Sequence, residues 1–325
     1  MRKFLQKVLL LLIVLGILLA GASSAYVHTD YYKNLNDMGK FSELPEHIDI
    51  VNFGASHSQN AFNWETYDSF SGVNMALGAQ TVVYDRALFH YYLDHLDENS
   101  TVVLEVMFKS LYEREQEEPY GTDIMRYYQI LPRKFIKHWT WKDALKFKYI
   151  PILGNRREAL SHIWREWVKG EQEEEKDILD DMLTGEPTQV LTGWEKDAML
   201  AEGNRRASVF MEVSGSQEHG AQYEAFIDII ETCKENHIQV ILVTAPTLPC
   251  FYEGFNEAFL NRFYADMEEI CEKYDLPYLD YTGDMRFLED YRWYTDTDHL
   301  NAYGAAIFTQ AFLQDVQELL PFYGE

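Results

Sequence analysis

The chain has 325 residues, enough for one large domain or two ordinary ones, and 47% of them are hydrophobic, so a sizeable core can form. Its 53 Asp and Glu outnumber its 28 Lys and Arg and give a net charge of -25. Nucleic-acid-binding proteins need a basic surface, so this balance argues against nucleic acid as a partner. The three cysteines, an odd number, build no disulfide framework.

The N-terminal segment, residues 1–27, has the composition of a membrane anchor or signal segment. Three of its first seven residues are basic, and residues 8–22 are uninterrupted in apolar residues and glycine. The small residues at 23–25 suit signal peptidase. With Val27 included the segment is long enough to cross a bilayer, and we favour an uncleaved single span with its basic end inside. A polar lead-in, residues 28–45, would then space an extracytoplasmic domain from the membrane. The alternative is a cleaved signal, which would leave the protein secreted.

From residue 46 to the end, predicted strands alternate with predicted helices. The strands are expected at 48–53, 72–77, 101–108, 238–244 and 277–281. Helices are expected at 81–96, 223–233, 255–270 and 302–320. This alternation predicts an α/β domain, residues 46–325, with a doubly wound parallel sheet in a flavodoxin-like three-layer arrangement.

The stretch 110–220 breaks this rhythm and is interpreted as a largely helical insertion. Residues 126–150 are basic and aromatic, which fits a surface for membrane lipid or an anionic polymer, or else an amphipathic helical cap. The acidic run 171–181 indicates a solvated helix face. Residues 183–216 lack clear periodicity, so we expect an irregular stretch there, either an active-site cover or a partly mobile segment.

Two short motifs at opposite ends of the pattern carry the chemistry. Ser56 stands in a Gly-Ala-Ser turn directly after the first strand, at a strand end where open α/β sheets place their sites. Asp296 precedes His299 by three residues in a loop before the last helix. At that spacing the carboxylate can reach the imidazole and fix its tautomer. His299 would then act as the base that takes the proton of Ser56.

Neighbouring residues leave alternatives to this assignment. Asp298 is adjacent to His299 and competes with Asp296 for the role of orienting acid. His57 follows Ser56 and is interpreted as a helix-start residue that hydrogen-bonds locally. A metal site built from both aspartates and both histidines is the less favoured reading. The serine mechanism that we favour needs neither metal nor cofactor.

The two motifs together resemble those of the SGNH/GDSL hydrolase superfamily, over residues 46–110 and 219–320 but not in between. Members carry a nucleophilic serine in a Gly-x-Ser turn and an Asp-x-x-His loop near the C-terminus. The resemblance implies a serine esterase or acyltransferase with Ser56, His299 and Asp296 as its triad. The backbone N–H of Ser56 is one candidate oxyanion donor, and the resemblance suggests Gly78 as the second.

The chain departs from the superfamily after the central strand. Members carry a Gly-x-Asn-Asp motif there, whose asparagine is a third oxyanion donor. Residues 105–110 read Glu-Val-Met-Phe-Lys-Ser instead. This argues against a free-standing esterase of broad specificity. The layout is similar to that of anchored proteins acting in teichoic-acid D-alanylation and of exported partners of membrane-bound O-acyltransferases.

We therefore expect an extracytoplasmic, membrane-anchored protein that acts on an acylated cell-envelope polymer or glycan. A membrane-bound O-acyltransferase is a candidate partner. The competing hypothesis is a non-catalytic SGNH-like surface protein for binding or assembly, supported by the missing asparagine. The insertion leaves the central strand at the edge that carries Ser56, so residues 126–167 are expected to wall the pocket.

Overall fold

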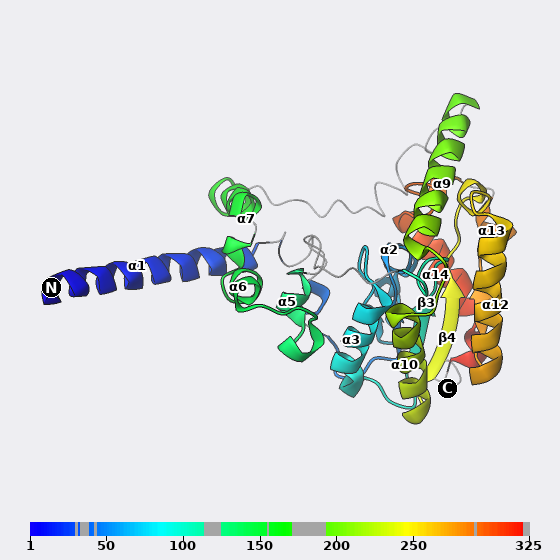
Figure 1. The fold of residues 1–325 in the computed structure, drawn as a ribbon, viewed down its shortest axis with the longest axis horizontal. Helices are drawn as coiled ribbons and strands as arrows, with labels where there is room; N and C mark the ends of the chain where they lie inside the picture. The colour runs from blue at the N-terminus through cyan, green and yellow to red at the C-terminus, as the bar shows by residue number, and fades with distance from the viewer. Residues whose placement is uncertain are drawn as a thin grey trace. The chain divides into compact units, whose positions relative to one another are not determined.

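The computed structural model describes residues 1–29, 32, 39–41, 44–113, 125–154, 156–170, 193–288 and 291–320. The chain divides into two compact units. The first comprises residues 1–44 and 117–176 and contains the N-terminal helix with much of the insertion. The second comprises residues 45–116 and 177–325 and contains the sheet (Figure 1).

The second unit is built on a parallel sheet of five strands in the order β2-β1-β3-β4-β5. The strands are β1 Ile50–Phe53, β2 Gly72–Asn74, β3 Thr101–Glu105, β4 Gln239–Thr244 and β5 Tyr278–Asp280. Val51 of β1 lies opposite Val73 of β2 and Val102 of β3. Every residue of β1 and β3 is buried, as expected of parallel strands covered on both faces. The predicted α/β fold and parallel sheet are confirmed.

Helices cover both faces of this sheet, which makes it doubly wound. The main ones are α2 Ser56–Ala61, α3 Val82–Tyr92, α10 Ala221–Glu235, α12 Glu257–Tyr274 and α14 Ala302–Asp315. Phe308 and Phe312 of α14 share a core cluster with Ile50 of β1. Phe53, on the opposite face of β1, meets Phe89 of α3. Helix α3 packs against α10, which contacts α12 in turn.

Short elements connect these layers. They are η3 Trp64–Thr66, η4 Leu93–His95, α11 Pro249–Tyr252, α13 Met285–Leu288, η9 Tyr291–Trp293 and η10 Gln317–Leu319.

The buried side-chain amide of Asn52, in β1, holds helix α2 in place. It donates to Ser58 Oγ at 2.9 Å and to Asn74 Oδ1 at 2.9 Å. Its own oxygen accepts from the indole N–H of Trp64 at 2.7 Å. Strands β1 and β2 and helix α2 are thereby held as one block.

One prediction for the insertion is wrong. Part of the stretch expected to be irregular forms a long helix, α9 Gly193–Ser214, which packs against α11. Its contact face combines Phe210, whose ring lies edge-on to Phe251 of α11, with small residues. A Cβ on Gly203 would lie 2.4 Å from the carbonyl oxygen of Cys250, and Ala207 is fully buried. Glycine and alanine add little to a hydrophobic pattern, so residues 193–214 show no clear periodicity in the sequence. The acidic run 171–181 lies outside the described residues.

The first unit is helical. Its elements are α1 Arg2–Val27, η2 Gly39–Phe41, α5 Tyr127–Ile130, η5 Arg133–Phe135, α6 Trp141–Ala144, η6 Leu145–Tyr149, η7 Pro151–Leu153, α7 Arg156–Ile163 and η8 Trp164–Val168. Within the described part of the chain, α1 is the one helix long and apolar enough to cross a membrane, a test that a signal sequence also passes. The expectation of a helical insertion is confirmed for these segments.

The turn that leaves β1 requires glycine. Gly54 has a φ of +139°, and a Cβ there would lie 2.7 Å from Cβ of Ser58 and 2.9 Å from Oε2 of Glu105. Its backbone N–H donates to Asp85 Oδ1 at 3.1 Å. Two buried carboxyl groups therefore stand directly behind the turn that carries Ser56.

These two carboxyl groups are unusual because of their burial. Asp85 also accepts from the side-chain amide of Gln80 at 2.6 Å, whereas neither oxygen of Glu105 has a hydrogen-bond partner among the described residues. Burial raises the pKa of Asp85 to about 7. Burial, together with the neighbouring charge of Asp85, raises the pKa of Glu105 to about 8. Glu105 is thus favoured in its neutral form at neutral pH.

We predict that Glu105→Gln removes part of the pH dependence of stability. The pKa of Glu105 is raised from 4.5 to about 8 on folding, so its contribution is fully present below pH 4.5 and is lost as pH rises through 8. The melting temperature of the parent protein should therefore fall between pH 5 and pH 8.5. The melting temperature of the glutamine variant should fall less over this range. At pH 8.5 it should be about 4 °C or more above that of the parent protein, measured by circular dichroism.

Glu98→Gln, at an exposed acidic residue of the same unit, serves as the matched control and should leave the slope unchanged. A Glu105→Gln variant whose melting temperature follows the parent at every pH would show that this carboxyl group is not held neutral by the fold.

Candidate active site

Ser56 and His299 meet at the carboxyl-terminal edge of the sheet. Ser56 is the first residue of α2, immediately beyond the Gly54 turn, and His299 lies in the loop before α14. Ser56 Oγ lies 2.7 Å from Nε2 of His299, although 243 positions separate the two residues. Both side chains are only partly buried, so a substrate can approach them. The distance is within hydrogen-bond reach, as a nucleophile and its base require.

The loop that presents His299 is closed by its own backbone. Tyr294 and Leu300 form an antiparallel bridge, and the N–H of Thr295 donates to the carbonyl of His299 at 2.9 Å. Asn301 then caps α14 by accepting from the N–H of Gly304 at 2.9 Å. A short loop pinned at both ends leaves the imidazole little freedom to move away from the serine.

Asp296 is the carboxylate that orients His299. Both of its oxygens lie 2.9 Å from Nδ1, and Oδ1 also accepts from the backbone N–H groups of Asp298 and His299. Burial alone would raise the pKa of Asp296, but the hydrogen bonds from His299 and from the backbone outweigh it and lower the pKa. An ionised carboxylate only accepts, so Nδ1 must carry the proton and Nε2 offers its lone pair to Ser56.

Asp298 has a different partner. Its nearest oxygen is 4.0 Å from Nδ1 of His299, whereas Oδ2 lies 2.9 Å from Nε2 of His57 and 2.6 Å from Nη2 of Arg206. Its side chain is fully buried. Burial opposes its ionisation, but the bonds from His57 and Arg206 prevail and hold its pKa well below the usual range. Asp298 is therefore a buried anion neutralised by Arg206.

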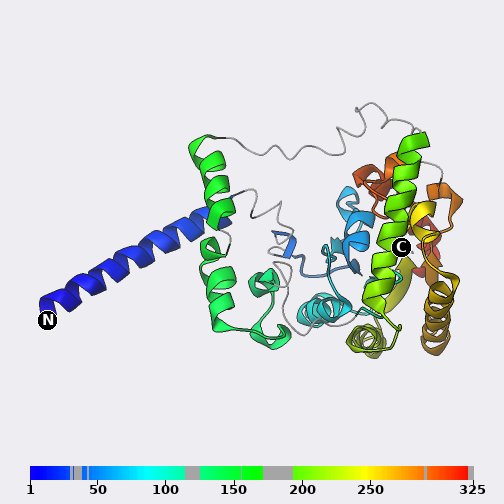
Figure 2. The same cartoon turned by 45° about the horizontal axis from the view of Figure 1, so that its top comes forward.

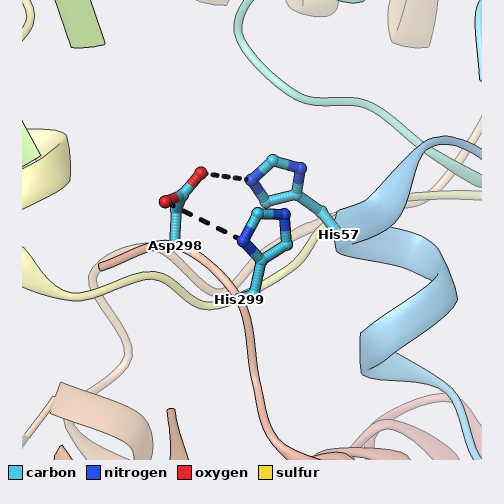
Figure 3. Close-up of side chains that lie close together, drawn as sticks. All are labelled: His57, Asp298 and His299. Carbon is cyan, nitrogen blue, oxygen red and sulfur yellow. Dashed lines mark hydrogen bonds and ion pairs between the residues drawn. The ribbon is translucent and has the colours of Figure 1, made fainter. Parts of the chain in front are cut away.

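His57 forms a second histidine–aspartate pair, stacked on the first. Its ring lies over that of His299, with centroids 4.5 Å apart and planes inclined by 25° (Figure 3). Burial, reinforced by the nearby charges of His299 and Arg206, lowers the pKa of His57 to about 4 despite its bond to Asp298. His57 is therefore neutral near pH 7 and donates its Nε2–H to Asp298. Because the His57 ring is held by this hydrogen bond, it limits rotation of the His299 ring that stacks on it.

The metal alternative fits this arrangement less well than paired hydrogen bonds do. His57, Asp298 and His299 each offer a ligand atom, all within 4.8 Å of one another (Figure 3). However, the guanidinium of Arg206 already lies on the Asp298 carboxylate, and its positive charge would repel a metal cation there. Nδ1 of His299 is also bonded to Asp296, which is not part of this cluster.

Two residues of α9 border the site and were not foreseen from the sequence. Arg206 contacts Asp298, and the ring of Phe210 lies edge-on to His57 with centroids 5.9 Å apart. No motif marks either residue. His57 and Asp298 carried a faint signal, because each is the immediate neighbour of a triad residue and the two must come close once Ser56 meets His299.

The oxyanion donors stay a prediction. The residues around Gly78 dock on the turn before Ser56, since the N–H of Leu77 and the amide of Gln80 both donate to the carbonyl of Gly54, at 3.4 and 3.3 Å. Within the stretch 105–110, residues 106–108 are apolar and buried and carry no side-chain donor. The expectation that residues 126–167 wall the pocket also stays a prediction.

Comparisons with known proteins identify no family for this chain. No model of a known protein family matches it, and no curated protein does. Among solved structures, it is similar to one described as a "putative acylhydrolase" from Bacteroides fragilis NCTC 9343. The two share 13% sequence identity with a TM-score of 0.40, over 89% of this chain and 98% of the other. A similarity this distant carries no conclusion about activity.

Proposed function

We propose that this protein is a membrane-anchored, extracytoplasmic serine ester hydrolase or O-acyltransferase that acts on acyl groups of a cell-envelope polymer or glycan. The observation that carries the proposal is the relay from Ser56 Oγ to His299 Nε2 at 2.7 Å and from His299 Nδ1 to Asp296 at 2.9 Å. The environment of Asp296 fixes the tautomer that lets His299 act as a base.

In the first half-reaction, Ser56 Oγ attacks the acyl carbonyl carbon while its proton passes to His299 Nε2. Asp296 stabilises the imidazolium, and the N–H groups of Ser56 and Gly78 would hold the oxyanion. Ser56 begins α2, so its N–H has no acceptor within the helix. When the tetrahedral intermediate collapses, the ester C–O bond breaks and His299 returns the proton to the leaving alcohol. An acyl group remains on Ser56.

In the second half-reaction, His299 takes a proton from water or from a polymer hydroxyl, which attacks the acyl-enzyme. When this second tetrahedral intermediate collapses, the acyl–Oγ bond breaks and His299 returns the proton to Oγ, which regenerates Ser56 and releases an acid or a new ester. The partial exposure of Ser56 and His299 supports an acceptor larger than water. The apolar helix α1 supports a location at the membrane.

The second candidate is a non-catalytic binding or assembly protein with the same fold. It is favoured by the apolar stretch where superfamily members carry a donor asparagine. Against it stands the polar relay itself, because binding alone does not require a serine, a base and an orienting carboxylate in line. Reactivity of Ser56 separates the two candidates.

We predict that a fluorophosphonate probe labels the protein covalently at Ser56, located by peptide mass spectrometry. Ser56→Ala should abolish labelling, and His299→Ala should slow it by about 10³-fold or more because the serine loses its base. Both variants should keep the parent circular-dichroism spectrum. A folded parent protein that resists the probe would favour the non-catalytic candidate, and labelling that survives Ser56→Ala would show that another residue reacts.

A second prediction separates the two aspartates. Asp296→Asn should lower esterase activity by about 10³–10⁴-fold, because an amide no longer enforces the reactive tautomer of His299. Its melting temperature should change little, since Asp296 is partly exposed.

Asp298→Asn should show the reverse pattern. Loss of the buried carboxylate leaves Arg206 without its counter-charge and should cost about 3 kcal/mol of unfolding free energy. Its activity at a temperature where the variant is folded should fall far less than that of Asp296→Asn. A larger loss of activity at Asp298 would transfer the orienting role to that carboxylate.

A further inference from the structure

Two helical segments of the first unit expose an apolar face. Along α6 and η6 the face consists of Trp141, Leu145 and Tyr149, spaced by four residues. Along α7 and η8 it consists of Leu160, Trp164, Trp167 and Val168, which recur at three- and four-residue spacing. Each of these seven side chains is 47–69% exposed. Large apolar residues at helical spacing form one stripe per segment, and no described residue of the unit buries either stripe.

The same region is basic in an otherwise acidic chain. Residues 125–170 contain 11 of the 28 Lys and Arg but only 3 of the 53 Asp and Glu. Lys142, Lys148 and Arg157 are exposed within or beside the two apolar stripes. Basic side chains beside exposed tryptophans are typical of helices that lie in the headgroup layer of a membrane.

The position of these helices on α1 agrees with that location. The side chains of α1 are exposed as far as Leu18, and from Leu19 to Tyr26 the helix packs against Ile152 and Ala159. The exposed part is about 26 Å long, close to the roughly 30 Å of a hydrocarbon core. The packed part covers about 10 Å, the depth that interfacial helices occupy. In Figures 1 and 2, the helices of residues 141–168 gather at this end of α1.

We propose that α6–η6 and α7–η8 form an interfacial collar that lies on the outer leaflet around an uncleaved α1, with their tryptophans in the headgroup layer and their basic side chains on anionic lipid. This inference rests on the membrane location in the proposed function. It assigns the insertion a role in holding the protein to the surface of the bilayer.

Lipid accounts for the observations better than a protein partner does. The exposed stripes lie on segments packed at the end of an apolar helix, so a bilayer that surrounds α1 reaches them without any further binding event. Near an anionic surface each Lys or Arg adds electrostatic attraction. Each buried tryptophan adds apolar contact area with its N–H left at the wet boundary.

The collar also opposes removal of α1 by signal peptidase. Cleavage after the small residues at 23–25 would delete Leu19, Ala22 and the buried Ser23, while Tyr26 would lose its helical support. The first unit would then lose one wall of its small core, which comprises Tyr26, Ile152 and Ala159. A protein whose anchor is part of its fold should retain its first residues when mature.

The test uses the full chain reconstituted in vesicles of phosphatidylcholine and phosphatidylglycerol, with lipids brominated either near the headgroup or near the chain end. Tryptophan fluorescence should be quenched most by the shallow bromines. The triple variant Trp141→Phe, Trp164→Phe and Trp167→Phe keeps the surface apolar and should lose most of that quenching. Trp293→Phe, in the other compact unit, is the matched control and should lose little.

A charge variant tests the lipid headgroup. Lys142→Glu, Lys148→Glu and Arg157→Glu together should reduce shallow quenching in vesicles with phosphatidylglycerol, and should do so less in phosphatidylcholine alone. Equal quenching of the parent and the triple phenylalanine variant would overturn the collar. If the protein inserts but shallow bromines do not quench its tryptophans, the collar is also overturned and the stripes are assigned to a protein partner. A mature protein whose mass lacks α1 would overturn the collar as well. Fluorophosphonate labelling of Ser56 in the same vesicles reports on the proposed chemistry separately.

Discussion

The buried carboxylate of Asp298 is the constraint on which the candidate site depends. It is fully buried between His57 of α2 and Arg206 of α9, and so it joins three segments that are far apart in the sequence. A buried charge is costly unless it is paired, and here the pairing fixes the ring that stacks on His299. Helix α9, the loop before α14 and the ring stacked on the base are therefore tied together through one satisfied anion.

Two aspartates in one short loop take different roles because their surroundings differ. Asp296 is partly exposed, accepts two backbone N–H groups and faces Nδ1 of His299, which suits it to stabilise an imidazolium that appears and disappears. Asp298 is buried and paired with the permanently charged guanidinium of Arg206, so it is not available to respond to a charge on His299. Composition alone cannot separate the two residues, because their distances to His299 are set by the fold of the loop.

The sequence predicted the sheet and the three residues of the relay, because strands such as residues 101–105 carry strong β-branched runs and Ser56 and His299 stand at predicted element ends. It failed where contacts are made by residues that leave no pattern. Helix α9 packs through Gly203 and Ala207, which look like loop composition, and Arg206 is one charge among many. The buried Glu105 was noticed only as a departure from a motif, since its burial depends on packing that no local rule reports.

If the site works with the two predicted oxyanion donors, Ser56 and Gly78, and without a donor asparagine, it should be slow, because removing a single donor costs about 10²–10³ in rate. Under the proposed function, anchoring offsets part of this loss. An enzyme held at the membrane and a polymer attached to the same envelope share a thin layer, so their effective concentration exceeds that of free partners. A collar that fixes the distance of the first unit from the bilayer surface would reduce the shared volume further. Slow chemistry at Ser56 and firm attachment through α1 are then two parts of one arrangement, which suits repeated modification of a long polymer better than rapid turnover of small esters.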